Sequence, residues 1–156
     1  MHLLFVCTGN TCRSPLAEGI ARHAIAERGI VDVSASSAGI SAWDGASASD
    51  GALLVAMEHG IDLAEHRARM LTPEIVEGAD LILAMGSSHI ERVHDLGGGA
   101  RAYLLSAFGT HDQQAESISD PYGGDLVVYR RTFDELSALV HGTLDRIVND
   151  REPPAR

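Results

Sequence analysis

The segment LLFVCTGNTCRSP, residues 3–15, combines three features that predict local structure. Leu3–Val6 is a short continuous apolar run, which is typical of a strand buried on both faces in a parallel sheet. Ser14 and Pro15 are a favourable helix start, because a hydroxyl cap is followed by proline at the first helical position, and Gly29 is expected to end that helix. The segment therefore predicts a strand, a loop and a helix in direct succession.

The same alternation continues along the chain. Further strands are predicted to begin at residue 31 and to cover 81–85 and 102–105. Further helices are predicted at 47–59, from 72 onwards, at 87–96 and at 124–148, with a polar loop at 109–123. In the helix at 47–59, the side chains expected to point inward are Leu53, Leu54 and Met57.

Strands that alternate with helices predict an α/β fold with a parallel sheet. We expect one domain over residues 1–150 and a disordered tail over 151–156. Ligands of such folds bind at the carboxyl ends of the strands, which places the predicted ligand site at residues 7–13, directly after the first strand.

Composition excludes several classes of function. The net charge is −10 and all twelve basic residues are arginine, which argues against nucleic acid or an anionic membrane as a partner. Neither an apolar run of membrane-spanning length nor the basic start of a signal peptide is present, so we expect a cytoplasmic protein. Two cysteines five residues apart predict neither a disulfide framework nor a zinc site, and we expect no metal and no cofactor.

The spacing C-x5-R-S between a strand and a helix favours an oxyanion. Backbone N–H groups of the loop and the positive end of the helix point to the same place. Gly9 allows close backbone approach, Asn10 tolerates a left-handed conformation, and Arg13 offers a fork that fits two phosphate oxygens. These features predict a phosphate-binding loop.

Cys7 at the base of such a loop is a candidate nucleophile. The positive surroundings are expected to lower the pKa of its thiol, and a hydrogen bond from Ser14 would favour the thiolate further. Attack on phosphorus would give a phosphocysteine, with the charge of the phosphoryl group held by loop amides and Arg13. The alternative is that Cys7 is a small buried hydrophobic residue in an inert loop.

A leaving group needs a proton, and Asp120 in the segment DPYGG, residues 120–124, is a candidate donor. Aspartate before proline is also a common turn former, so both interpretations stay open at this point. A Walker-type nucleotide loop is excluded because the chain lacks G-x4-G-K.

Several segments together resemble one family, the low-molecular-weight protein-tyrosine-phosphatases. They are FVCTGNTCRSPLAE at 5–18, SAGI at 37–40, GIDL at 60–63, HRAR at 66–69, ADLILAM at 79–85 and DPYGG at 120–124. The resemblance covers nearly the whole chain. It implies a four-stranded parallel sheet in the order 2-1-3-4 with helices on both faces.

The resemblance also implies roles for the site residues. Cys7 would be the nucleophile, Arg13 the phosphate clamp, and Asp120 the general acid and then the base that activates water. The resemblance implies supporting roles for the other residues of the loop and its surroundings: Ser14 would stabilise the thiolate, Asn10 would brace the loop, Thr8, Gly9 and Thr11 would line the phosphate site, Cys12 would be the redox partner of Cys7, and Trp43 and Tyr122 would form pocket walls. Trp43 can equally be a surface residue, and Cys12 an inert thiol.

Thr11 bears on the substrate. Tyrosine-specific members often carry a bulky aliphatic residue at this position, whereas threonine with D-P-aromatic-G-G resembles the branch that acts on phosphoarginine in proteins. Our prediction is a phosphotyrosine phosphatase acting on phosphorylated proteins as a monomer, with phosphoarginine as the alternative. Arsenate reductase and a non-catalytic phosphate-binding module are further alternatives, but thiol-coupled arsenate reductases need cysteines beyond the two present here.

Overall fold

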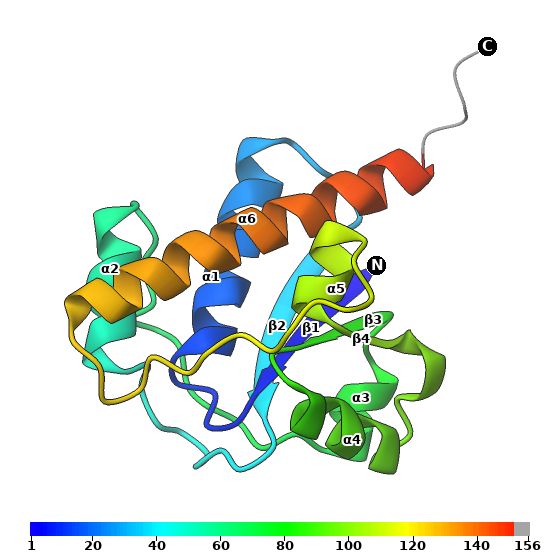
Figure 1. Ribbon diagram of the computed structural model, residues 1–156, viewed down its shortest axis with the longest axis horizontal. Coiled ribbons are helices and arrows are strands. Elements are labelled where there is room, and N and C mark those ends of the chain that lie inside the picture. Colours follow the sequence, from blue (N-terminus) through cyan, green and yellow to red (C-terminus); the bar gives the residue numbers. More distant parts are fainter. Residues whose placement is uncertain (152–156) are drawn as a thin grey trace.

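The computed structural model describes residues 1–151, which form a three-layer α/β fold around one parallel sheet. The strands are β1 (His2–Cys7), β2 (Ser34–Gly39), β3 (Leu81–Ala84) and β4 (Ala102–Leu104), in the order β2-β1-β3-β4 (Figure 1). Every neighbouring pair is parallel. The predicted fold class and strand order are confirmed.

The helices cover both faces of the sheet. They are α1 (Arg13–Glu27), α2 (Asp50–Glu58), α3 (Pro73–Glu77), α4 (Ser87–Asp95), α5 (Leu105–Thr110) and α6 (Leu126–Arg151), with a 3-10 turn η1 at Gly99–Arg101. Because side chains alternate along a strand, Leu3 and Phe5 of β1 join the core with α1 and α6, whereas Leu4 and Val6 join the core with α3 and α4. This two-sided burial is the reason for the continuous apolar run at the start of the chain.

The second strand begins later than its apolar start suggests. Val31 is exposed and Asp32 has a left-handed backbone with φ of 65°, so the chain turns there before β2 begins at Ser34. The short helix α5 was not predicted, because its sequence LSAFGT reads as the end of a strand followed by a polar loop. The long final helix was predicted within three residues at each end.

Of the three residues predicted to point inward from α2, Leu53 is partly buried and packs against the core, whereas the prediction is wrong for Leu54 and Met57. Leu54 and Met57 are 51% and 70% exposed, and the buried residues are Ala52, Val55 and Ala56. Small side chains on this face let α2 pack closely against its neighbours, whereas the larger ones point to solvent. Hydrophobicity alone therefore selected two residues of the helix that are exposed.

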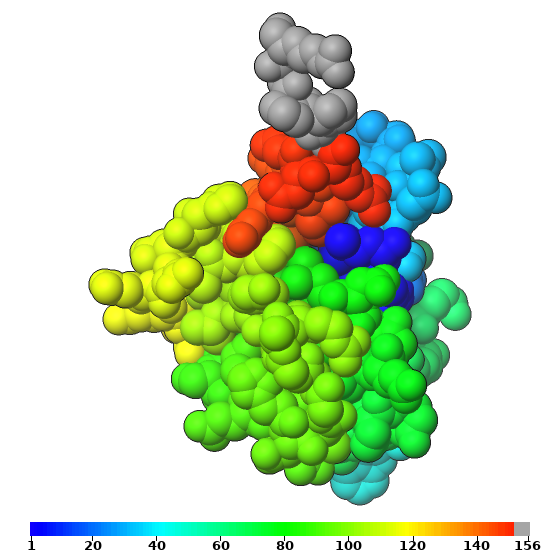
Figure 2. Space-filling model, turned by 90° about the vertical axis from the view of Figure 1, so that its right-hand side faces the viewer, coloured from blue at the N-terminus to red at the C-terminus, as the bar shows by residue number. Residues whose placement is uncertain are grey.

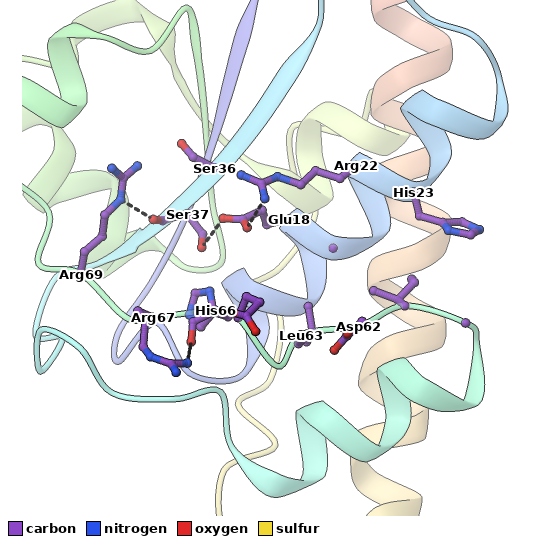
Figure 3. A pocket seen from close by; sticks show the side chains of 14 residues that line it. Glu18, Arg22, His23, Ser36, Ser37, Asp62, Leu63, His66, Arg67 and Arg69 are labelled. Atoms are coloured by element: carbon purple, nitrogen blue, oxygen red, sulfur yellow. Dashed lines mark hydrogen bonds and ion pairs between the residues drawn. The ribbon is translucent and has the colours of Figure 1, made fainter.

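The free edge of β2 is closed by two arginines. Arg22 donates from Nε to the carbonyl of Ala35 at 3.0 Å, and Arg69 donates from Nε to the carbonyl of Ser37 at 2.9 Å. Both line a polar cavity of about 580 Å³ beside this edge (Figure 3). Because the outward carbonyls are occupied, a further strand cannot pair there without displacing them.

The end of α6 lies beside the start of the chain, at the far end of the sheet from the loop that follows β1. Figure 2 shows the terminal part of α6 next to the N-terminal residues. Arg151 donates to the carbonyl of Val31 at 3.3 Å and is the last residue of α6, so the predicted tail begins at least one residue later. The rest of that tail, residues 152–156, lies outside the described residues. No helix in the described range combines the length and apolarity needed to cross a membrane.

Candidate active site

The loop between Cys7 and Arg13 lies at the carboxyl end of β1, between β2 and β3. Its shape depends on two unusual backbone positions. Asn10 is fully buried and has a left-handed φ of 56°. Gly39 at the end of β2 lies so close to the loop that a Cβ there would be 2.5 Å from the carbonyl oxygen of Thr8. The glycine of the SAGI segment therefore makes room for the loop.

Cys7 is buried within hydrogen-bond reach of the residues that surround it. Its Sγ lies 2.8 Å from Ser14 Oγ, and the backbone N–H of Asn10 donates to it at 3.3 Å. Burial raises the pKa of the Cys7 thiol above its usual value, although the hydrogen bonds of Ser14 and Asn10 and the charge of Arg13 act to lower it. The prediction of a lowered pKa is therefore wrong, because the sequence does not reveal how completely the sulfur is removed from water.

Of the two contacts predicted for Ser14, the structure shows the one with the Cys7 sulfur and not the helix cap. Helix α1 begins at Arg13, its cap position is Cys12, and no side chain caps it. The hydroxyl of Ser14 instead accepts from the Asn10 amide Nδ2 at 2.8 Å, which leaves the hydroxyl proton free to be donated to Cys7. The predicted cap is wrong, and the hydroxyl is turned toward the sulfur.

Asn10 connects the loop to β2 and α1. Its Nδ2 also donates to Ser37 Oγ at 2.9 Å, and Ser37 in turn donates to Glu18 Oε1 at 2.9 Å (Figure 3). Its Oδ1 accepts from the backbone N–H of Arg69 at 3.0 Å. Each polar atom of the buried amide therefore has a partner, and the loop is braced from three directions.

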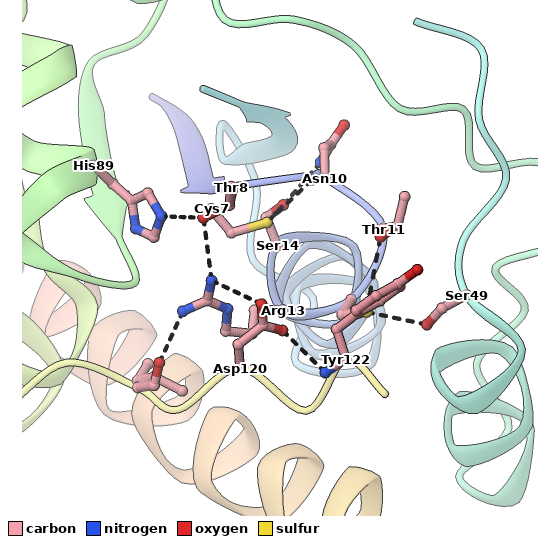
Figure 4. A network of polar contacts seen from close by, with 12 residues as sticks. Cys7, Thr8, Asn10, Thr11, Arg13, Ser14, Ser49, His89, Asp120 and Tyr122 are labelled. Carbon is pink, nitrogen blue, oxygen red and sulfur yellow. Dashed lines mark hydrogen bonds and ion pairs between the residues drawn. The ribbon is translucent and has the colours of Figure 1, made fainter. Parts of the chain in front are cut away.

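Arg13 is buried, with its guanidinium held at the mouth of the loop (Figure 4). One Nη donates to the carbonyl of Ile118 at 2.9 Å. The other lies 3.5 Å from Thr8 Oγ1 and 3.6 Å from Asp120 Oδ2. Asp120 is half exposed, and its Oδ1 accepts from the backbone N–H of Tyr122 at 3.1 Å, so the DPY turn aims the carboxylate at the loop.

Residues far apart in the chain line one small cavity of about 190 Å³ above the sulfur. Its walls combine the loop with the DPY turn: Cys7, Thr8, Gly9, Thr11, Cys12, Arg13, Asp120 and Tyr122. Trp43 is not among them and is 84% exposed. The predicted wall role therefore fits Tyr122, and the structure does not support it for Trp43.

Cys12 is held by two residues that the sequence did not single out for the site. Its Sγ lies 3.2 Å from Ser49 Oγ and 3.3 Å from the hydroxyl of Tyr129, and these two hydroxyls are 3.1 Å apart. Ser49 caps α2 and Tyr129 belongs to α6. Both cysteines are free thiols.

Two histidines near the loop were also missed. His66 lies with Nε2 2.8 Å from the carbonyl of Asn10, and the buried His89 lies with Nε2 2.9 Å from Thr8 Oγ1. His66 opens the HRAR segment that carries part of the family resemblance, but that segment was given no role in the site, and His89 lies in no segment that was singled out. Across residues 1–151, no three His, Cys, Asp or Glu side chains gather as metal ligands would.

The arrangement is suited to phosphoryl transfer. Loop amides, the start of α1 and Arg13 offer positive charge at one point, which favours an oxyanion above Cys7. The sulfur of Cys7 and the carboxylate of Asp120 both line the cavity in which such a group would bind. They can therefore supply attack on that group and proton transfer to it.

Known proteins share both the sequence and this fold. The sequence profile described as low molecular weight phosphotyrosine protein phosphatase matches residues 2–152. A protein-arginine-phosphatase of Bacillus subtilis is 37% identical, over 97% of this chain and 99% of the relative. A low molecular weight protein-tyrosine-phosphatase of Staphylococcus haemolyticus is 40% identical, over 90% and 95%.

Solved structures agree with these relatives. The low molecular weight protein tyrosine phosphatase of T. tengcongensis superimposes with a TM-score of 0.86 at 40% identity, covering 94% of this chain and 99% of that one. An arginine phosphatase whose active-site cysteine was replaced by a serine that carries phosphate gives 0.87 at 35% identity, covering 97% and 98%. The chain belongs to the low molecular weight phosphotyrosine protein phosphatase family.

Proposed function

We propose that this enzyme hydrolyses phosphotyrosine on proteins through a phosphocysteine intermediate. The observation that carries the proposal is the single cavity shared by Cys7, Arg13 and Asp120. In the first step the Cys7 thiolate attacks phosphorus, the bond from phosphorus to the tyrosine oxygen breaks, and Asp120 donates a proton to that oxygen. A related arginine phosphatase with a phosphorylated serine at its active site supports a covalent intermediate at this position.

The second step returns the enzyme to its starting state. Asp120, now ionised, takes a proton from water while the water oxygen attacks phosphorus. The bond between phosphorus and sulfur breaks, inorganic phosphate leaves, and Cys7 is again a thiolate. In both steps Arg13 and the loop amides hold the phosphoryl oxygens, so the charge that moves between sulfur and oxygen stays compensated.

Burial sets the main electrostatic difficulty for this chemistry. The pKa of the Cys7 thiol is raised by its removal from water. The donated hydrogen bonds of Ser14 and Asn10 therefore support the reactive thiolate directly, since each stabilises only the charged form. We infer that the Asn10 network is part of the catalytic apparatus and not only a brace.

Phosphoarginine is the second candidate substrate. Thr11 lines the cavity with a hydroxyl, where an aliphatic side chain would narrow the slot around a flat phenol. The relative from Bacillus subtilis and one from Geobacillus stearothermophilus, 35% identical, are protein-arginine-phosphatases. The chemistry would be the same, with a phosphorus–nitrogen bond breaking and Asp120 protonating nitrogen.

Kinetics on matched phosphotyrosine and phosphoarginine peptides decide between the two substrates. Wild type should favour phosphotyrosine in kcat/KM, and Thr11→Ile should increase that preference. Thr11→Ser, which keeps the hydroxyl, is the matched control. A wild-type preference for phosphoarginine that Thr11→Ile removes would establish the second candidate instead.

The thiolate mechanism has its own test. Cys7→Ser should abolish hydrolysis of para-nitrophenyl phosphate while phosphate still binds, and wild-type turnover by that variant would overturn the mechanism. A non-catalytic binding module predicts no turnover by wild type. Vigorous arsenate reduction in the presence of thioredoxin would instead favour an arsenate reductase.

We also infer that the enzyme acts in the cytoplasm on phosphorylated proteins. A mechanism that needs a free thiol at Cys7, five residues from Cys12, favours a reducing compartment. Fractionation of cells followed by immunoblotting tests the compartment, and recovery outside the cytoplasmic fraction would contradict it.

A further inference from the structure

His89 is a buried polar residue that the proposed chemistry does not use. It lies in the first turn of α4, which follows β3, the neighbour of β1 in the sheet. Its side chain is only 3% exposed. Within the described residues, its Nδ1 is the one buried side-chain nitrogen or oxygen atom without a hydrogen-bond partner. An imidazole in such a place calls for an explanation, because buried polar atoms are nearly always paired.

One side of the imidazole contacts the phosphate-binding loop. His89 Nε2 lies 2.9 Å from Thr8 Oγ1, and the same oxygen lies 3.5 Å from Nη2 of Arg13 (Figure 4). A guanidinium can only donate, so Thr8 Oγ1 accepts from Arg13 and its single proton is available to Nε2. His89 then fixes the rotation of the Thr8 hydroxyl and turns a lone pair toward Arg13.

The other side of the imidazole faces the segment that carries Asp120. A Cβ built on Gly86 would lie 3.2 Å from Ser117 Oγ and 3.6 Å from His89 Nδ1, so both atoms border the same point. The next residue, Ile118, donates its N–H to the carbonyl of Met85 at 2.8 Å and accepts from Arg13 at 2.9 Å. His89 therefore sits at the junction between the loop and this segment.

The surroundings keep the imidazole uncharged. Burial, and next the charge of Arg13, lower the pKa of His89 to about 4, although Asp120 acts to raise it. These are the charged groups that face it, one from α1 and one from the 117–120 segment. A neutral His89 adds no second cation beside Arg13 and can accept the Thr8 proton at neutral pH.

We propose that His89 is a positioning residue of the phosphoryl site, which orients Arg13 through the hydroxyl of Thr8. The proposal rests on the proposed phosphatase function. A residue that only fills space would affect the site through packing, whereas the effect of His89 must pass through the hydroxyl of Thr8. A variant that loses the His89 imidazole nitrogen and a variant that loses the Thr8 hydroxyl, each with little change in side-chain volume, should therefore lose the same contribution to catalysis.

A double-mutant cycle with His89→Phe and Thr8→Val tests this dependence. We expect each single variant to lower kcat/KM for para-nitrophenyl phosphate by about tenfold, as expected for one lost hydrogen bond, and to weaken binding of inorganic phosphate. The double variant should be no worse than the more impaired single variant.

Two control variants accompany the cycle. His89→Gln, which keeps a polar group at the site, should recover most of the activity, and His94→Gln on the exposed side of α4 should match wild type. Losses that add, or wild-type kinetics in folded His89→Phe, overturn the proposal.

Nitrogen NMR of wild type provides a second arm that does not depend on a variant folding. We expect His89 to be neutral, protonated on Nδ1 and not Nε2, and without titration from pH 5.5 to 8. Thr8→Val should shift its Nε2 resonance. A charged imidazole at pH 7, or no response to Thr8→Val, overturns the proposal. Absence of turnover by wild type would instead count against the proposed function and leave this measurement intact.

Discussion

Ser14→Ala should raise the pKa of Cys7 further and slow the enzyme most at pH values below that pKa. The hydroxyl lies 2.8 Å from the sulfur and is oriented by the Asn10 amide so that it donates. A hydrogen bond to a charged group contributes about 1.5–3 kcal/mol, and one pKa unit corresponds to about 1.4 kcal/mol, so the pKa should rise by about one to two units. Below that pKa, the thiolate fraction and kcat/KM should both fall by about ten- to a hundredfold.

The sign follows from which form the hydrogen bond stabilises. Ser14 stabilises the thiolate, so its loss favours the protonated thiol and raises the pKa. The acidic limb of the pH profile therefore moves to higher pH. At a pH above the shifted value the thiolate is again fully formed, and most of the loss in rate should disappear. A variant that lost activity through misfolding would be slow at every pH.

The assay is the pH dependence of Cys7 alkylation by iodoacetamide, followed by peptide mass spectrometry to separate Cys7 from Cys12. The pH profile of kcat/KM on para-nitrophenyl phosphate gives an independent value, and thermal unfolding confirms that the variant is folded. Asn10 Nδ2 loses its contact with Ser14 in the variant but keeps its hydrogen bond to Ser37, which continues to hold the loop. An unchanged alkylation pKa in a folded variant would refute the reasoning.

Three further predictions follow from single contacts. Asp120→Asn should slow phenyl phosphate about a hundredfold and para-nitrophenyl phosphate much less, because a good leaving group needs no proton; equal losses would contradict the acid role. Gly39→Ala should lower the melting temperature, since its Cβ would lie 2.5 Å from a carbonyl oxygen of the loop and overpacking costs about 1–3 kcal/mol; a wild-type melting curve would show that the loop can shift freely. Tyr129→Phe should speed formation of a Cys7–Cys12 disulfide under peroxide, because Cys12 loses a partner at 3.3 Å; mass spectrometry that finds an unchanged rate, or only sulfinic acid at Cys7, would argue against this regulation.

The features of the fold that could be predicted are those that depend on residues next to one another in the sequence. The apolar run of β1 is buried on both faces, as its composition indicates, and the loop follows at the predicted place. Leu54 and Met57 of α2 were wrongly predicted to point inward because they are more hydrophobic than Ala52 and Ala56, yet close helix packing selected the alanines. Local patterns therefore predict where elements lie better than which face they bury.

The site divides in the same way. Cys7 and Arg13 belong to one short loop and could be recognised together, and Asp120 was recognised from its own motif. Ser37 and His89 reach the loop from 27 and 81 residues away. Ser37 opens the SAGI segment of the resemblance, but that segment does not reveal which loop residue its side chain contacts, and the sequence around His89 carries no motif. The contacts that position catalytic groups are tertiary, so they become visible only when the strands are placed side by side.

The pKa of Cys7 shows why these tertiary contacts decide the chemistry. The sequence predicted that the positive charge of the loop lowers the pKa of the Cys7 thiol, yet burial raises this pKa in the structure. The burial of Cys7 and Arg13 strengthens the interaction of a bound phosphoryl group with Arg13, but it also penalises the thiolate that must attack. The directed hydrogen bonds from Asn10 and Ser14 act against that penalty and reduce it. A buried nucleophile in this fold therefore requires a buried network of donors around it, and the left-handed asparagine at the centre of the loop is where the fold provides one.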